Sequence, residues 1–473
     1  MNARASGLAA LAICLLFNGA ALAADAPKSA AVGVCDKYEP LVLKSMQAKN
    51  FLSAVRASGE YEETVLGLYP APTFELGLMQ NQAHHLSMQS SFDGWTQESL
   101  KALDLPDWLP SMGFDLLLAL KGPQEGDRFV VMAMDLGKVA KRMGLKDADP
   151  LGKISDQYLL TSAQMFSQNF GAIDTLDLRN YGPSRAAVAK MKAGVGEAPS
   201  LIVCLGNNGI VYAFLVTSTN EHQADNLKKL EQTIKSLDFT FKPADDMAIA
   251  AARKTIRDEG DVSQSLACVR QLAAVGEYNA AVDELSHLRV VIGDQMPKPV
   301  VENNVARYDL YGLTLKNPDA KRWKLSQDST GNMAMLLLED RNSVSDGGIM
   351  VAVINMTFVY GPKAGAAISD PKNDEMRRNM VLSAGRGGIL NIGGEIDSEQ
   401  FHTFKELLGY EAVATITKAD NLKVKGTFLI DGDCLVMIME MVDARNFKVN
   451  VAEYDKVLDD SLQIVPMTTK DGG

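Results

Sequence analysis

One arrangement of elements occurs twice in this chain of 473 residues. Two apolar strands joined by a turn at 206–209 precede an amphipathic helix that closes on Ser236-Leu237. Near the C-terminus, two apolar strands joined by a turn at 431–433 again precede a helix, which closes on Ser461-Leu462. Because each turn precedes its Ser-Leu pair by almost the same spacing, the sequence predicts two copies of one α+β domain.

The N-terminus predicts export. Arg4 precedes an apolar run at 8–17, and the small-residue pattern that follows ends at Ala23. Such a run is typical of a signal peptide and is shorter than the roughly 20 apolar residues of a membrane-spanning helix. We expect cleavage near Ala23 and a periplasmic or secreted mature protein. A lipoprotein box is not favoured, because Ile13 stands before Cys14 where a small residue is needed.

Length and charge limit the function classes. The chain is longer than one hydrophobic core usually organises, so two or three domains are expected. A composition of 47% hydrophobic and 22% charged residues is that of a globular chain. The net charge of -12 is spread along the sequence and repels nucleic acid and anionic lipid head groups, so neither is expected as a partner.

Four cysteines follow the expected signal peptide, namely Cys35, Cys204, Cys268 and Cys434. An oxidising compartment permits disulfides, but the wide spacing leaves every pairing open. Because Cys204 and Cys434 lie in apolar strand runs, we interpret them as small buried side chains.

The segment between the two copies is predicted to be helical, at 245–257 and 263–292. Residues 276–281, Gly-Glu-Tyr-Asn-Ala-Ala, resemble the turn and second-helix start of a tetratricopeptide repeat. Val269 and Leu288 depart from that pattern, which usually has small residues there. A single unit cannot bury its faces in a stack, so we interpret this hairpin as a helical spacer.

The second copy carries a family resemblance. Residues 308–315 are followed by a turn at Pro318, by Trp323, by several strands, and by a central helix, a hairpin and the Ser-Leu helix. This order is similar to the PsbP-like and DcrB-like domains of exported proteins, and the matching elements of the first copy are 84–89 and Gly94-Trp95. The resemblance implies an antiparallel sheet with helices on both faces, used in binding and assembly rather than in catalysis.

The predicted fold class is α+β, with two related antiparallel-sheet domains that carry covering helices and are connected by a helical spacer. Small and polar residues at 25–31 predict a flexible leader, and apolar residues at helical spacing predict helices at 36–57. The expected boundaries are 1–23 for the signal peptide, 24–71 for the leader and N-terminal helices, 72–243 for the first domain, 244–299 for the spacer and 300–473 for the second domain.

No recognisable catalytic string occurs, whether His-Glu-x-x-His, Gly-x-Ser-x-Gly, a Walker A loop or a complete EF-hand. His84 and His85 are adjacent in a predicted strand, where neighbouring side chains point to opposite faces. The sequence therefore lacks the closely spaced ligand pairs that are typical of tetrahedral metal sites. We predict no enzyme activity, no metal site and no cofactor.

The glycine-rich segment 385–395 is the strongest local anomaly. Glycine N–H groups can form an anion-binding turn, and Arg386 with the nearby Arg377 and Arg378 would supply positive charge. The segment lacks the spacing of a dinucleotide-binding loop, so a flexible loop is the alternative interpretation. The candidate ligand-binding residues are Arg386, Gly387, Gly388 and Glu395.

A basic turn formed by Lys321, Arg322 and Trp323 stands out on this acidic chain. A cation and an aromatic ring together can contact a partner protein, so these residues are the candidate partner contact. In the alternative interpretation the turn is solvated and Trp323 is buried in the core of the second copy.

The duplication and the missing catalytic strings favour an exported, non-enzymatic binding or assembly protein of the bacterial cell envelope, with a protein partner. The alternative is a small-anion-binding protein or a hydrolase, with its site at 385–395 or between the domains. A deep polar site that gathers Arg386, Glu395 and a histidine would favour the alternative. Scattered and shallow positions would favour protein binding.

Overall fold

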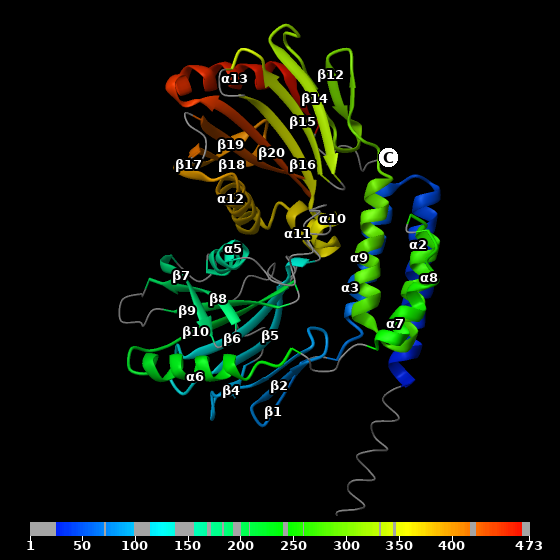
Figure 1. The fold of residues 1–473 in the computed structure, drawn as a ribbon, viewed down its shortest axis with the longest axis vertical. Coiled ribbons are helices and arrows are strands. Elements are labelled where there is room, and N and C mark those ends of the chain that lie inside the picture. Colours follow the sequence, from blue (N-terminus) through cyan, green and yellow to red (C-terminus); the bar gives the residue numbers. More distant parts are fainter. Residues whose placement is uncertain are drawn as a thin grey trace, which may run out of the picture. The chain divides into compact units, whose positions relative to one another are not determined.

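The computed structural model describes residues 25–70, 72–98, 114–137, 156–167, 172–181, 184–192, 200–207, 209–239, 245–258, 260–330, 333–343, 347–416 and 422–465 (Figure 1). The expected signal peptide, residues 1–23, lies outside this part of the chain. Contacts divide the chain into two compact units. One unit combines the chain up to Met88 with Leu237–Ile292, and the other combines Gln89–Ser236 with Gly293–Gly473.

The first copy contains a seven-stranded antiparallel sheet in the order β4-β5-β6-β10-β9-β8-β7. Helices α5 (Asp156–Ser167) and α6 (Gln223–Lys235) lie on opposite faces of this sheet (Figure 1). The amphipathic closing helix predicted before Ser236-Leu237 is α6, which buries Leu230 and Ile234. The strands are β4 (Thr96–Gln97), β5 (Phe114–Lys121), β6 (Arg128–Asp135), β7 (Ile173–Tyr181), β8 (Ser184–Met191), β9 (Leu201–Asn207) and β10 (Ile210–Thr217).

The second copy contains a seven-stranded antiparallel sheet in the order β14-β15-β16-β20-β19-β18-β17, which repeats the strand order of the first copy. Figure 1 shows α12 (Asp374–Asn391) on one face and α13 (Phe447–Ser461) on the other. The predicted fold class is thereby confirmed. The strands are β14 (Trp323–Thr330), β15 (Met333–Asp340), β16 (Gly348–Asn355), β17 (Gly394–Phe404), β18 (Leu407–Ile416), β19 (Leu422–Asp431) and β20 (Cys434–Asp443), and the short helices α10 (Met356–Tyr360) and α11 (Pro362–Ser369) precede α12.

The central strand β10 of the first sheet is apolar on both faces because helices cover both faces of that sheet. In β10 every residue from Val211 to Val216 is buried, without the alternation of a half-exposed strand. The edge strands β7 and β17 differ, since both are mostly exposed. Each also contains a bulge, and the extra residue is Asp174 in β7 and Asp397 in β17. A lysine pairs with each of these aspartates, Lys190 at 4.0 Å and Lys423 at 2.9 Å.

Three short strands that belong to a smaller sheet precede each large sheet in the chain. In the first copy β1 (Thr73–Glu75), β2 (Leu78–Asn81) and β3 (Leu86–Gln89) form this sheet, and Ser87 of β3 bridges to Asp238. In the second copy the strand β21, which directly follows α13, pairs with β13 in the corresponding way. The strands are β11 (Val300–Glu302), β12 (Val305–Tyr308), β13 (Leu313–Lys316) and β21 (Leu462–Ile464).

The helical part contains α2 (Asp25–Gln47), α3 (Phe51–Leu66), α7 (Asp246–Arg253), α8 (Val262–Val275) and α9 (Tyr278–Asp294). The prediction of a flexible leader at 25–31 is wrong, because α2 begins at Asp25. Asp261 caps α8 by accepting hydrogen bonds from Ser263 N and Gln264 N, and Gly276 ends it in the left-handed region at φ 86°. The tetratricopeptide-like nature of the α8–α9 hairpin stays a prediction, as do the domain boundaries.

Two arginines of the later helices form ion pairs with the N-terminal helices within this unit. Arg270 of α8 donates from Nη2 to Glu39 Oε2 of α2 at 2.8 Å. Arg289 of α9 donates to Glu62 of α3, and both side chains are buried, with 1% and 4% of their surface exposed. The segments before and after the first sheet domain therefore share one core.

All four cysteines of the described chain are free and buried, which confirms the interpretation of Cys204 and Cys434. Burial raises the pKa of the Cys268 thiol to about 11 and that of Cys204 further, so neither is a ready nucleophile. Within the described residues, no helix has the length and apolar character needed to cross a bilayer.

Candidate functional site

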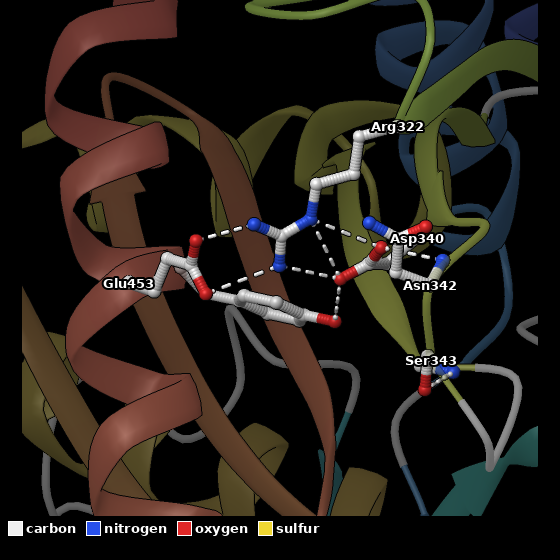
Figure 2. Close-up of polar contacts among 7 residues, drawn as sticks. Arg322, Asp340, Asn342, Ser343 and Glu453 are labelled. Atoms are coloured by element: carbon white, nitrogen blue, oxygen red, sulfur yellow. Dashed lines mark hydrogen bonds and ion pairs between the residues drawn. The ribbon is translucent and has the colours of Figure 1, made fainter.

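The basic turn before β14 carries a cluster of polar contacts in the second copy (Figure 2). Arg322 donates from Nε and Nη2 to the carboxylate of Asp340, at 3.1 and 2.7 Å. On its other side the same guanidinium donates from Nη1 and Nη2 to Glu453 of α13. One arginine thus bridges the end of β15 and the closing helix, and both of its bidentate partners are carboxylates of the same domain.

Asp340 is the buried centre of this cluster, with 7% of its surface exposed. It also accepts hydrogen bonds from Tyr454 Oη at 3.1 Å and from Asn342 N at 3.0 Å. Burial alone would raise the pKa of this carboxyl, but Arg322 and the other donors outweigh burial and lower it. Asp340 therefore stays ionised and holds α13 on the sheet.

Trp323 lies in the core, with 2% of its surface exposed. Its ring meets Tyr454 of α13 edge to face, with 5.1 Å between the ring centroids. The position of Trp323 matches the alternative interpretation, in which this ring is buried in the core of the second copy. Of Lys321, Arg322 and Trp323, Lys321 is the exposed residue. The basic turn does not present a cation and an aromatic ring together to solvent.

The closing helix of the first copy is held in a similar way. Asp127, which is completely buried beside the β5–β6 turn, accepts from Thr219 N at 2.9 Å. Its Oδ2 lies 2.8 Å from Nδ1 of His222, the residue before α6. In both copies one buried aspartate near the end of a hairpin fixes the closing helix. Sequence reasoning missed Asp127 and Asp340, because their partners are far away along the chain.

The glycine-rich segment is helical up to Asn391, so its interpretation as a loop is wrong. Two glycines let α12 approach the sheet closely. A Cβ at Gly385 would lie 2.4 Å from ring atoms of Tyr410, and one at Gly388 would lie 3.4 Å from Phe428. A Cβ at Gly387 would meet nothing within 4 Å. The glycine pattern is thus explained by helix packing rather than by an anion-binding turn.

These positions give a matched pair of variants. Gly385→Ala is expected to lower the free energy of unfolding by about 1–3 kcal/mol, because the methyl group must displace the Tyr410 ring. Gly387→Ala, on the open side of the same helix, should raise it by about 0.5–1 kcal/mol through reduced chain entropy. Urea denaturation followed by circular dichroism measures both. Equal effects of the two variants would contradict the packing described here.

Arg386 is already paired. It donates from Nε to Glu399 Oε2 of β17 at 3.0 Å, and Tyr410 donates to the same oxygen at 2.5 Å. The hydrogen bond from Arg386 holds the pKa of Glu399 below its usual range. Glu395 is exposed at the start of β17 and is not joined to Arg386 by any ion pair among the described residues. Ligand binding at Arg386, Gly387, Gly388 and Glu395 stays a prediction.

A polar cluster that sequence reasoning missed lies on the sheet face next to α13. The ammonium of Lys425 lies 3.4 Å from Glu440 Oε1 and 3.5 Å from Glu411 Oε2, and it also pairs with Asp455 of α13. His402 adds a fifth titratable group, with Nδ1 at 3.6 Å from Glu411. Burial of Glu440, which is 1% exposed, raises its pKa to about 8. Three acidic side chains from three elements thus share one lysine.

The adjacent histidines His84 and His85 lie in a different element from the one expected. His84 and His85 lie in the turn before β3, so their placement in a strand is wrong. His85 Nε2 lies 2.6 Å from Asn279 Nδ2 of α9. Among the residues that the structure describes, no group of three or more His, Cys, Asp or Glu side chains has a geometry suited to a metal ion.

The solved structures that are similar to this chain include two of low TM-score. The solution structure of cyanobacterial PsbP (CyanoP) from Synechocystis sp. PCC 6803 gives a TM-score of 0.23 at 12% identity, over 35% of this chain and 94% of that one. A crystal structure from Bacteroides thetaiotaomicron VPI-5482 gives 0.21 at 12% identity, over 58% of this chain and 87% of that one. No protein-family model and no curated protein sequence matches the chain.

At these TM-scores neither likeness carries an argument about fold or function. A PsbP structure is among the similar structures, in line with the resemblance expected from the sequence. The DcrB-like and tetratricopeptide-like resemblances stay predictions.

Proposed function

We propose that this chain is an exported, non-enzymatic binding or assembly protein of the bacterial cell envelope, whose duplicated sheet domains bind another protein. The observation that carries the proposal is the internal pairing of Arg386 with Glu399. The strongest candidate for anion recognition already has a carboxylate partner in its own domain. Its charge therefore contributes to holding α12 against β17.

The distribution of the other candidates supports the same choice. Arg322 is paired with Asp340 and Glu453, and Trp323 is buried. Glu395 is exposed, while Lys425 is shared by three acidic side chains. Polar groups are thus scattered over the second copy and are used to join its elements, which favours a binding scaffold over a hydrolase or a small-anion receptor.

Photo-crosslinking in the native envelope tests this proposal. A benzophenone amino acid at Tyr158 of the first copy or Phe401 of the second, which are 44% and 42% exposed, should give a reproducible adduct with one protein. The same side chain at Met247 on α7, which is 83% exposed, is the control for non-specific capture.

Two outcomes would contradict the protein-binding part of the proposal. One is a small molecule that co-purifies reproducibly in native mass spectrometry while no protein adduct forms. The other is binding of inorganic phosphate in calorimetry that Arg386→Ala abolishes, which would restore the small-anion alternative. Recovery of the chain in the cytoplasm with residues 1–23 intact would contradict export.

A further inference from the structure

The turn of the β1–β2 hairpin contains Leu76, which is unusual both in its backbone conformation and in its exposure to solvent. Leu76 has φ 51° and Gly77 has φ 78°, so both residues of the turn lie in the left-handed region. That region suits glycine and asparagine but is strained for a leucine. The side chain of Leu76 is also fully exposed, at 101% of its reference surface. Burial in the fold therefore does not offset the backbone strain.

The second copy supplies an internal comparison. Its β11–β12 hairpin turns at Asn303 and Asn304, with φ 51° and 61°. Asparagine is the residue type that this turn geometry favours, because its short polar side chain tolerates the left-handed region. The hairpin can thus be built with polar residues. Leucine at position 76 is not a requirement of the turn.

The residues around Leu76 indicate which kind of partner surface it could contact. Leu78, the next residue but one, is 36% exposed, and the intervening and preceding positions are Gly77 and the exposed Glu75. Burial of one leucine changes an affinity on the order of 10- to 100-fold, which is less than association costs. A lone leucine cannot hold this chain on a lipid surface, where stable attachment takes two signals. It suits the centre of a larger protein interface.

We propose that Leu76 inserts into an apolar socket of a partner protein whose rim is basic and faces Glu75. The charge assignment follows from the exposed carboxylate beside the tip and from the net charge of -12. Strain in the free protein is retained because the residue serves binding rather than folding. This inference names a contact surface for the proposed protein-binding function and rests on it.

Leu76→Asn in the full chain separates stability from binding. It copies the turn of the second copy, so the midpoint of thermal unfolding should rise by about 2 °C. Affinity for the partner should fall at least about tenfold. The control Asn303→Leu should lower the midpoint and leave the affinity unchanged. A Leu76→Asn variant with unchanged affinity would overturn the inference.

The partner is identified by placing the benzophenone amino acid at position 76 or, as the matched control, at position 303. Support consists of one protein adduct at 76 and none at 303, with the purified adduct partner binding the wild type more tightly than Leu76→Asn. Adducts with lipid, or with a second copy of the chain, would overturn the inference. Adducts from Tyr158 or Phe401 without one from position 76 would reject the inference and leave the proposed function in place.

Discussion

Arg289→Met is expected to lower the free energy of unfolding of the helical unit by about 3–5 kcal/mol. The arginine donates to Glu62 across the α3–α9 interface, and less than a tenth of either side chain is exposed. Methionine fills a similar volume but leaves the carboxylate buried without its cation. Urea denaturation should show the loss, and hydrogen exchange should show earlier opening of α3 and α9.

Two further variants separate charge from packing. Glu62→Leu combined with Arg289→Met should recover most of the loss, because well-packed apolar residues often replace a buried ion pair without cost. Arg185→Met removes the exposed pair with Asp156 and should change the free energy of unfolding by at most about 1 kcal/mol. If Arg289→Met costs no more than Arg185→Met, the buried pair does not organise this core.

Glu440→Gln is expected to change how stability depends on pH. Burial raises the pKa of Glu440 from 4.5 to about 8 in the folded state. The folded chain keeps this proton while the unfolded chain loses it, so the stabilising effect of the proton is complete below pH 4.5. It falls as pH rises towards 8, by about 1.4 kcal/mol for each pH unit. Glutamine resembles the protonated acid and should remove this decline.

The measurement compares unfolding free energies of the wild type and Glu440→Gln at pH 5 and pH 9. The two proteins should be similar at pH 5, and the variant should be more stable by several kcal/mol at pH 9. The facing groups Lys425, Glu411, Asp455 and His402 are retained in both. Glu395→Gln, at an exposed position, serves as the control. An equal decline in all three proteins would show that Glu440 does not carry the effect.

Periodicity and repetition predicted most of the fold. The two predicted Ser-Leu endings correspond to α6 and α13 with their preceding hairpins. They could be predicted because amphipathic helices and apolar strands are recognisable from the pattern of neighbouring residues. The prediction of a loop at 385–395 was wrong because glycine is favoured both in turns and at close contacts between a helix and a sheet. Only the position of Tyr410 against Gly385 decides between the two.

The polar clusters could not be predicted from the sequence. Arg322 and Glu453 are 131 positions apart, and Arg289 and Glu62 are 227 apart. The sequence shows a charged residue but not its ion-pair partner, which becomes evident only in the folded chain. This is why Arg386 suggested a ligand site although Glu399, only 13 positions further on, pairs with it.

The bulged edges of the two large sheets bear on how this chain avoids misfolding. A polypeptide that contains the same sheet twice can exchange or stack strands between its copies while it folds. Asp174 and Asp397 interrupt the regular hydrogen-bonding rows of β7 and β17, and each places a carboxylate there. The outermost strands therefore make poor templates for one another. Duplication thus added a second large sheet without adding a regular strand edge for aggregation at β7 or β17.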